Sequence, residues 1–135
     1  MFRAFADTHF FVALFDRSES HHLEAMALQR ECRLIITSEF VLLETLNAFA
    51  GAKQHLRIGT ARFIYALRSR PDFEVVPCSS GAFDDALQHY IDRPDKGWSL
   101  TDCASFLIMR DLGLTDALTE DRHFRQAGFR TLFAD

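Results

Sequence analysis

Short apolar runs alternate with longer helical patterns along the whole chain, and this alternation limits the fold more than any other feature. Strand-like runs are predicted at residues 2–6, 34–37, 73–76, 117–119 and 129–133. Helical patterns are predicted at residues 8–15, 20–32, 38–51, 58–69, 80–91, 99–112 and 122–127. Helical crossovers of this length join parallel strands. The predicted fold is therefore α/β: one domain over residues 1–135, with a parallel sheet of about five strands between α-helices.

Composition narrows the class of protein further. The 135 residues are 48% hydrophobic and include 14 Phe, so we expect one globule with a Phe-rich core. A net charge of −4 excludes a histone-like protein but allows a local basic face. The odd number of cysteines, three, argues against a disulfide framework. No apolar run approaches the ~18 residues of a membrane span and no signal-peptide pattern is present, so the expected location is cytoplasmic.

Several common catalytic motifs are absent from the sequence. It contains no G-x-G-x-x-G and no P-loop, so nucleotide cofactors have no support. It contains no G-x-S-x-G, which argues against a serine hydrolase. The six His form no H-E-x-x-H and no Cys/His ligand spacing, so the sequence predicts no zinc site.

Two aspartates follow the carboxyl ends of predicted strands. Asp7 comes after the first strand, and Asp121 comes after the strand at 117–119. In open parallel sheets, ligands bind outside the carboxyl ends of the strands, at a topological switch point. Each aspartate could equally cap the helix that follows it.

Two further carboxylates lie on predicted helices. Glu44 sits in the apolar helix 38–51, where a buried Glu is costly without a partner, so either an Arg partner or a functional role is expected. Asp102 lies three residues after Ser99, in a pattern typical of a capping box at a helix start. Taken singly, Asp102 is explained by capping.

Taken together, the four carboxylates predict a cation site. Like charges that converge in one crevice repel one another unless a cation lies among them. An all-oxygen donor set suits Mg²⁺ or Mn²⁺, and such ions stabilise the attacking and leaving oxygens in phosphodiester hydrolysis. We therefore expect a metal-dependent phosphodiesterase.

Four stretches resemble the PIN-domain nucleases and, in size, the VapC-type toxins of bacterial toxin–antitoxin pairs. The resemblance rests on the order and spacing of residues 6–14 (ADTHFFVAL), 37–44 (TSEFVLLE) with Asn47, 99–106 (SLTDCASF) and 119–129 (TEDRHFRQAGF). It implies a parallel sheet between helices and a metal-dependent endoribonuclease acting on RNA. It also implies that Asp7, Glu44, Asp102 and Asp121 are the catalytic, metal-binding quartet, with Thr8, Ser38 and Thr101 as hydroxyl groups near it.

The resemblance also implies partners. VapC-type proteins typically pair with an antitoxin whose tail enters the active-site groove, so an antitoxin is expected. A homodimer is expected as well, because a chain this apolar tends to leave a patch that a symmetric interface covers. Glu120 is an acid where the family often has a small residue, and its role stays open.

Basic residues gather in the span between Glu44 and Asp72, which contains no acidic residue. They form either a solvated helix face or a patch for the RNA backbone. The members are Lys53, Arg57, Arg62, Arg68 and Arg70.

Two other functions compete with the nuclease. An aspartate-based phosphotransfer protein, either a receiver domain or a haloacid-dehalogenase-like phosphatase, also uses an Asp after its first strand. The phosphatase expects Asp-x-Asp there, but this chain has His9 at the second Asp position. A non-catalytic binding module on a PIN-like scaffold is the second alternative, and the intact acidic quartet argues against it.

Overall fold

The computed structural model describes residues 2–134, and the chain alternates between strands and helices throughout them. The predicted α/β class is confirmed. Within this range the strands are β1 (Phe2–Ala6), β2 (Cys32–Ser38), β3 (Phe73–Val76), β4 (Asp116–Leu118) and β5 (Arg130–Thr131). The helices are α1 (Thr8–Phe15), α2 (His22–Glu31), α3 (Glu39–Ala48), α4 (Gln54–Leu67), α5 (Ser80–Asp92), α6 (Leu100–Asp111) and α7 (Arg122–Gln126).

The five strands form one sheet in the order β3-β2-β1-β4-β5, and every pair is parallel. The chain first builds outward from β1 through β2 to β3, then returns and continues from the other side of β1 through β4 to β5. The strand order therefore reverses between β1 and β4. This is the switch point at which ligands bind in sheets of this kind.

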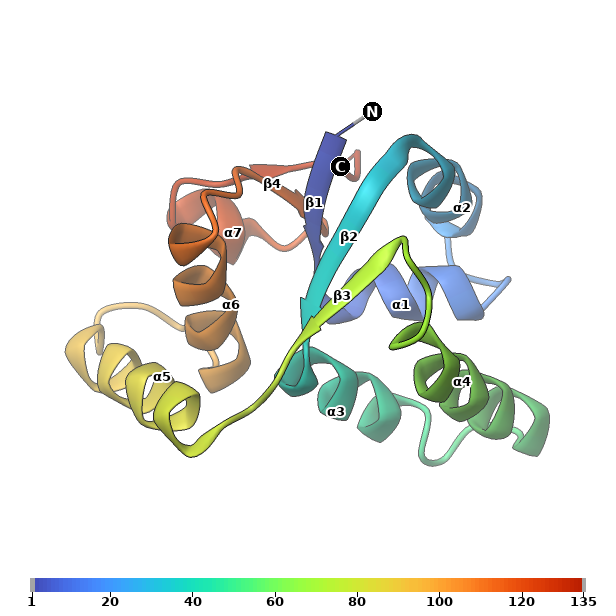
Figure 1. The fold of residues 1–135 in the computed structure, drawn as a ribbon, viewed down its shortest axis with the longest axis horizontal. Helices are drawn as coiled ribbons and strands as arrows, with labels where there is room; N and C mark the ends of the chain where they lie inside the picture. Colours follow the sequence, from blue (N-terminus) through green and yellow to red (C-terminus); the bar gives the residue numbers. More distant parts are fainter. Residues whose placement is uncertain (1, 135) are drawn as a thin grey trace.

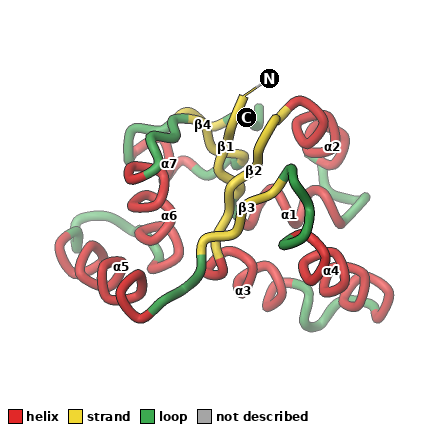
Figure 2. The backbone as a smooth tube through the Cα atoms, viewed as in Figure 1, coloured by secondary structure: helices red, strands yellow, loops and turns green. Residues whose placement is uncertain are grey.

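Helices cover both faces of the sheet. In Figure 1, α1, α2 and α4 lie on one side of the strands, and α5, α6 and α7 lie on the other. Helix α3 follows β2 at the carboxyl ends of the strands and contacts α1, α4 and α6. The tube view in Figure 2 shows loops joining the helices to the strands at both ends of the sheet. Helix α3 thus links the two helical layers beside the switch point.

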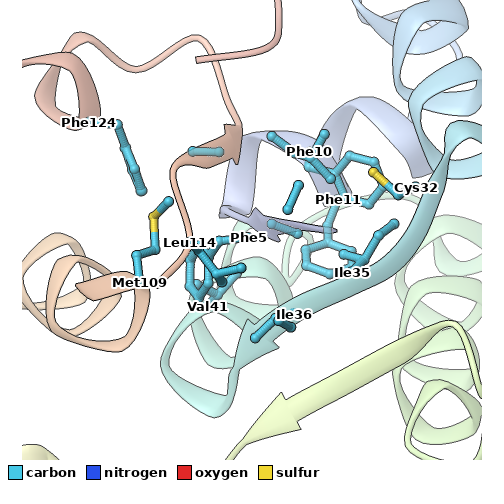
Figure 3. Packing of buried hydrophobic residues seen from close by; sticks show 14 of the residues in the cluster. Phe5, Phe10, Phe11, Cys32, Ile35, Ile36, Val41, Met109, Leu114 and Phe124 are labelled. Carbon is cyan, nitrogen blue, oxygen red and sulfur yellow. The ribbon is translucent and has the colours of Figure 1, made fainter. Parts of the chain in front are cut away.

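The core is rich in phenylalanine, as the composition predicted. Figure 3 shows side chains from β1, α1 and β2 meeting those of α6 and α7 around the sheet. Burying each large apolar side chain contributes about 1.5–3 kcal/mol. The largest fully buried side chains include Phe5, Phe10, Phe11, Phe106 and Phe124.

Three predicted helices differ from the observed ones by two or more residues at an end. The helix predicted at 20–32 ends at Glu31, because Cys32 already pairs with Phe2 in the sheet. The helix predicted at 58–69 begins four residues earlier, at Gln54; Lys53 before it offers no capping side chain that would have marked the start. The helix predicted at 38–51 ends at Ala48.

Helix α3 is also less buried than its apolar sequence predicted. Leu43 on this helix is 62% exposed, whereas Phe40 and Val41 are buried. Only one face of α3 packs on the rest of the molecule, and Glu44 is half-buried at the edge of that face. No helix of the described residues 2–134 is long and apolar enough to cross a membrane.

Gly113 ends α6, as the sequence indicated. It follows the C-cap residue Leu112 and has a φ of +67°, and the amide of Leu114 donates a hydrogen bond to the carbonyl of Met109 at 2.8 Å. This is the left-handed conformation that glycine adopts without strain.

We predict that Gly113→Ala destabilises the protein by about 1–2 kcal/mol, because an L side chain disfavours the left-handed region. The matched control is Gly59→Ala in α4. At both positions an added Cβ meets nothing within 4 Å, so the difference between them is φ alone. Gly59→Ala should raise the free energy of unfolding by up to about 1 kcal/mol. Urea denaturation measures both, and equal effects of the two variants would contradict this account.

Candidate active site

Asp7 lies buried at the carboxyl end of β1, beside the switch point. It occupies the N-cap position of α1, but its side chain does not cap that helix. The carboxylate instead accepts a hydrogen bond from the hydroxyl of Thr119, with 3.1 Å between Oγ1 and Oδ2. Thr119 directly follows β4, so this bond joins the ends of the two central strands. The simple capping interpretation of Asp7 is therefore wrong.

Glu44 reaches the same region from α3. Its Oε1 accepts a hydrogen bond from the Thr8 hydroxyl at 2.6 Å. Thr8 is the residue after Asp7, so this bond brings the start of α1 and the middle of α3 together. The Arg partner considered for Glu44 is wrong: within residues 2–134 its partner is Thr8, and Arg68 pairs with Glu39 instead, at 2.6 Å.

Asp102 completes the capping box that the sequence predicted. Its amide donates to the Ser99 hydroxyl, its Oδ2 accepts from the Ser99 amide, and both distances are 3.0 Å. The side chain is buried, because α6 packs against the sheet beside the switch point. The capping box leaves the carboxylate able to contact other groups as well.

Asp121 is the N-cap of α7 and accepts a hydrogen bond from the amide of His123 at 2.9 Å. Its own amide donates to the Thr119 hydroxyl at 3.0 Å. His123 lies between two acids: its Nδ1 is 3.1 Å from Asp102 Oδ2 and 3.5 Å from Asp121 Oδ1. The imidazole thus bridges two carboxylates that come from different helices.

The carboxylates act on one another electrostatically. Burial, with smaller contributions from Asp102 and Glu44, raises the pKa of Asp7 from 3.8 to about 7. Burial also raises the pKa of Asp102, and Asp121 adds to the effect, while hydrogen bonds from Ser99 and His123 oppose it. Negative charge is therefore concentrated in a poorly solvated place, where a cation would be stabilised.

The donor set fits a hard divalent cation. Carboxylate and hydroxyl oxygens dominate it, and Mg²⁺ and Mn²⁺ prefer oxygen ligands. One atom each of Asp102, Asp121 and His123 can be chosen so that all three lie within 4.8 Å of one another. The imidazole also suits Mn²⁺ and other transition ions.

The predicted hydroxyl residues have different outcomes. Thr8 contacts Glu44 directly. Ser38 is fully buried and caps α3 by accepting from the Val41 amide at 3.2 Å, so its contact is structural. Thr101 contributes its backbone carbonyl, which accepts from the Ser105 hydroxyl. The sequence analysis did not select Thr119, although the residue begins the stretch 119–129. Its position at the end of the strand predicted at 117–119 was the available signal.

The basic residues between Glu44 and Asp72 do not form one continuous surface of unpaired charges. Arg68 pairs with Glu39, and Arg70 makes two hydrogen bonds to Asp72. Arg57 donates to the carbonyl of Ala50. Within residues 2–134, Lys53 and Arg62 make no ion pair, and both are exposed on or before α4. Lys53 and Arg62 are therefore the residues of this span that are most available to contact RNA.

Residues 4–130 match the family model described as the PIN domain. The chain belongs to the PIN-domain family. The matched range contains β2, β3 and β4 in full and parts of β1 and β5. It also includes all four carboxylates. The resemblance stated from the sequence is confirmed.

A curated relative is also similar over nearly its whole length. The chain is 27% identical over 129 residues to the 23S rRNA-specific endonuclease VapC20 of Mycobacterium tuberculosis, covering 93% of this chain and 94% of that protein. The crystal structure of VapC20, described as a Sarcin-Ricin loop cleaving toxin, superposes with a TM-score of 0.81 at 26% identity, covering 93% of this chain and 95% of VapC20.

More distant structures share the fold. VapBC2 of Rickettsia felis, bound to a DNA fragment from its promoter, has a TM-score of 0.65 at 13% identity, over 96% of this chain and 97% of that chain. DNA-bound VapBC of Salmonella typhimurium has a TM-score of 0.64 at 17% identity, over 98% of each chain. At these identities the likeness supports the PIN fold alone.

We predict that the ionised Asp7 carboxylate destabilises the metal-free protein. Its pKa is about 7 in the folded protein against an ordinary 3.8, so the folded state holds the proton more tightly. The contribution of Asp7 to stability therefore falls as pH rises from about 4 to about 7, and is constant above that. In EDTA at pH 8, Asp7→Asn should stabilise the protein by on the order of 3 kcal/mol.

Urea denaturation of both proteins at pH 5, 6, 7 and 8 checks this prediction. The wild-type protein should lose stability relative to Asp7→Asn across the series. Saturating Mn²⁺ should reduce the difference, because a bound cation favours the ionised form. A difference that stays constant from pH 5 to pH 8 would contradict the raised pKa.

Proposed function

We propose that this PIN-domain protein is a metal-dependent endoribonuclease, acting on RNA in the cytoplasm as the toxin of a type II toxin–antitoxin pair. One observation carries the proposal: Asp7 lies buried at the switch point within electrostatic reach of Asp102 and Glu44, and Asp102 lies within reach of Asp121. The raised pKa of Asp7 supports it, because its burial among acids costs stability that a structural role does not require. The similarity to VapC20 supports RNA as the substrate class.

The proposed metal ligands are Asp7, Glu44, Asp102 and Asp121, holding Mg²⁺ or Mn²⁺ directly or through water. When bound, such ions stabilise charge on the attacking and leaving oxygens of a phosphodiester. The chain's own residues hold the carboxylates in place. Thr119 orients Asp7, and Thr8 orients Glu44.

His123 is proposed to position Asp102 and Asp121. As a hydrogen-bond donor to Asp102 Oδ2 it limits rotation of that carboxylate, together with the Ser99 amide, which donates to the same oxygen. The carboxylates are then preorganised before any ion binds, which lowers the reorganisation required for catalysis.

An antitoxin partner and a homodimer are part of the same proposal. The sequence similarity to VapC20, described as a toxin, supports the antitoxin. A basic side chain from the partner could neutralise the acidic cluster and so compete with metal, since Arg binds two carboxylate oxygens at once. Exposed apolar side chains on α3, α4 and α5 support a dimer, since symmetric interfaces cover such surfaces; they include Leu43, Tyr65, Tyr90 and Ile91.

We predict that Asp102→Asn abolishes RNA cleavage while the protein stays folded. An Asn side chain can still accept the hydrogen bond from the Ser99 amide, but it loses the charge that holds a cation. The rate should fall by roughly 100-fold or more, as when a principal charge-stabilising group is removed. The assay compares a structured RNA hairpin with single-stranded RNA, in Mg²⁺, in Mn²⁺ and in EDTA.

The matched control is Asp84→Asn, which removes one exposed carboxylate on α5. It should cleave as the wild-type protein does. Undiminished, EDTA-sensitive cleavage by Asp102→Asn would refute the assignment of the quartet. Absence of any cleavage by the wild-type protein with either ion would instead favour a non-catalytic binding module.

We predict that Lys53 and Arg62 contact the RNA backbone. Replacing both with Ala should weaken binding to every RNA and lower the salt slope by up to roughly one unit for each phosphate that is no longer neutralised. The control pair is Arg3→Ala with Arg33→Ala, which removes two exposed charges at the amino ends of β1 and β2, away from the candidate site. Binding titrations at several salt concentrations measure both pairs. Equal salt slopes for the two double variants would mean that Lys53 and Arg62 are only solvated and do not contact RNA.

We predict that expression of the wild-type chain alone slows growth of a bacterial host, whereas Asp102→Asn does not. The reason is RNA cleavage that no antitoxin restrains. Growth curves after induction, with protein levels matched by immunoblotting, measure the effect. If the host grows normally while the purified chain cleaves RNA in vitro, the toxin role is rejected. The proposal of an endoribonuclease would still stand.

A further inference from the structure

Two histidines and a glutamate meet beside the acidic cluster, on residues that the proposed nuclease does not use. His9 lies in the first turn of α1, His21 stands at the N-cap position of α2, and Glu120 lies between β4 and α7. His9 Nε2 is 3.2 Å from His21 Nδ1. Each histidine also has Nδ1 at 3.4 Å from a different oxygen of Glu120. Three segments distant in the sequence thus converge on one point.

The protonation of His21 is set by the C-terminal segment. Its Nε2 lies 2.9 Å from the carbonyl oxygen of Ala134, which can only accept, so Nε2 carries the hydrogen. The other nitrogen, Nδ1, is then an unprotonated lone pair that faces His9 and Glu120. A hydrogen bond of this kind to the remote nitrogen is the usual way in which a ligating imidazole is oriented.

Neither neutral form of His9 satisfies its neighbours. With the hydrogen on Nε2, His9 donates to His21, but its Nδ1 lone pair faces the Glu120 carboxylate at 3.4 Å. With the hydrogen on Nδ1, His9 donates to Glu120, but two ring lone pairs face each other at 3.2 Å. A cation among the three groups removes both conflicts. It is either an additional proton on one of the two histidines or a metal ion.

The spacing favours a metal ion. One ligand atom from each residue can be chosen so that all three lie within 4.8 Å of one another. The contacts of 3.2 Å between His9 Nε2 and His21 Nδ1 and of 3.4 Å between His21 Nδ1 and Glu120 are close to the ligand–ligand separation of about 3.3 Å in a tetrahedral zinc site with bonds of about 2.0–2.1 Å. Two imidazoles and one carboxylate are a donor set that suits zinc and similar transition ions.

The surroundings hold the histidines in place. The His21 ring stacks on Phe133, with 5.1 Å between centroids and 7° between planes, and the His9 ring lies 5.2 Å from the same phenylalanine. Phe133 is buried. The two histidine side chains are only 21% and 15% exposed, whereas Glu120 is 45% exposed. The cluster therefore has a rigid side formed by imidazoles and an open side from which an ion can enter.

We propose that His9, His21 and Glu120 form a binding site for a divalent transition-metal ion of the zinc class, separate from the carboxylates of the candidate active site. The bound ion ties the first turn of α1, the start of α2 and the β4–α7 loop to the C-terminal segment. These are the segments that carry Asp7 and Asp121. The site does not depend on the proposed nuclease activity, because its ligands are other residues.

Zinc binding to the purified full chain tests the proposal. The chain is stripped with a chelator, dialysed, and titrated with Zn²⁺ by calorimetry in excess Mg²⁺, which occupies the acidic cluster. One Zn²⁺ should bind per chain and raise the melting temperature. His9→Gln, His21→Gln and Glu120→Gln should each weaken binding by roughly tenfold or more. Circular dichroism checks that each variant is folded, and the exposed Glu120 is the safest position in that respect.

Two control variants separate this site from other sources of binding. His55→Gln removes an exposed histidine on α4, and Asp102→Asn disables the acidic cluster. Both should bind Zn²⁺ as the wild-type chain does. Loss of binding in Asp102→Asn with retention in His21→Gln would assign the ion to Asp102, Asp121 and His123 and overturn the proposal. No uptake of Zn²⁺ by the wild-type chain would also overturn it, and would assign the cation to a proton shared by the histidines.

Cobalt gives a direct view of the ligands. Co²⁺ bound by imidazole nitrogen in a four-coordinate site has visible absorption that hydrated Co²⁺ lacks. This absorption should appear in the wild-type chain and in Asp102→Asn, and it should disappear in His9→Gln and His21→Gln. Equal spectra for the wild-type chain and the two histidine variants would overturn the proposal.

Discussion

Burying the Asp7 carboxylate at the carboxyl end of β1 costs free energy, because water is replaced by protein around a group that carries charge. The structure offsets part of this cost with the hydrogen bond from Thr119, which crosses from the end of β4. The rest of the cost raises the pKa of Asp7 to about 7. The parallel pairing of β1 with β4 makes the bond possible, since it brings the ends of both strands to the same edge. The charges of Asp102 and Glu44 raise this pKa further, so a cation beside Asp7 would be stabilised.

Helix capping and the candidate active site use the same side chains. Asp102 closes the capping box of α6, and Asp121 caps α7. A capping carboxylate has few rotamers available, because its oxygen is held by the first backbone amides of the helix. Capping therefore places two of the four acids with little freedom, and the His123 imidazole joins them.

The elements that were predicted well are those with strong local signals. The strands at 2–6 and 73–76 match β1 and β3, because short β-branched or aromatic runs end there at a charged residue or a proline. The Ser99–Asp102 capping box and the Gly113 stop depend only on neighbouring residues, and both are confirmed. The start of α4 lacked such a signal, and its stability comes from packing on α3.

The side-chain partners were harder to predict, because they depend on distances that the sequence does not contain. Glu44 accepts from Thr8, 36 residues away, and Asp7 accepts from Thr119, 112 residues away. His123 had no pattern to mark it as the bridge between two acids. The cluster of His9, His21 and Glu120 matches no ligand spacing, and the sequence accordingly predicted no zinc site.

The sequence by itself determined the α/β class and the family, and it marked four acids at strand ends and on helices as candidates for one site. It could do so because periodicity, caps and turn residues act between near neighbours along the chain. Only the tertiary structure decided which acids share a site, which hydroxyl and imidazole hold them, and where two histidines meet a glutamate. The physical reason is the order of the strands: the reversal between β1 and β4 places residues near 7, 102 and 121 together. That placement depends on packing across the whole sheet, and no local pattern encodes it.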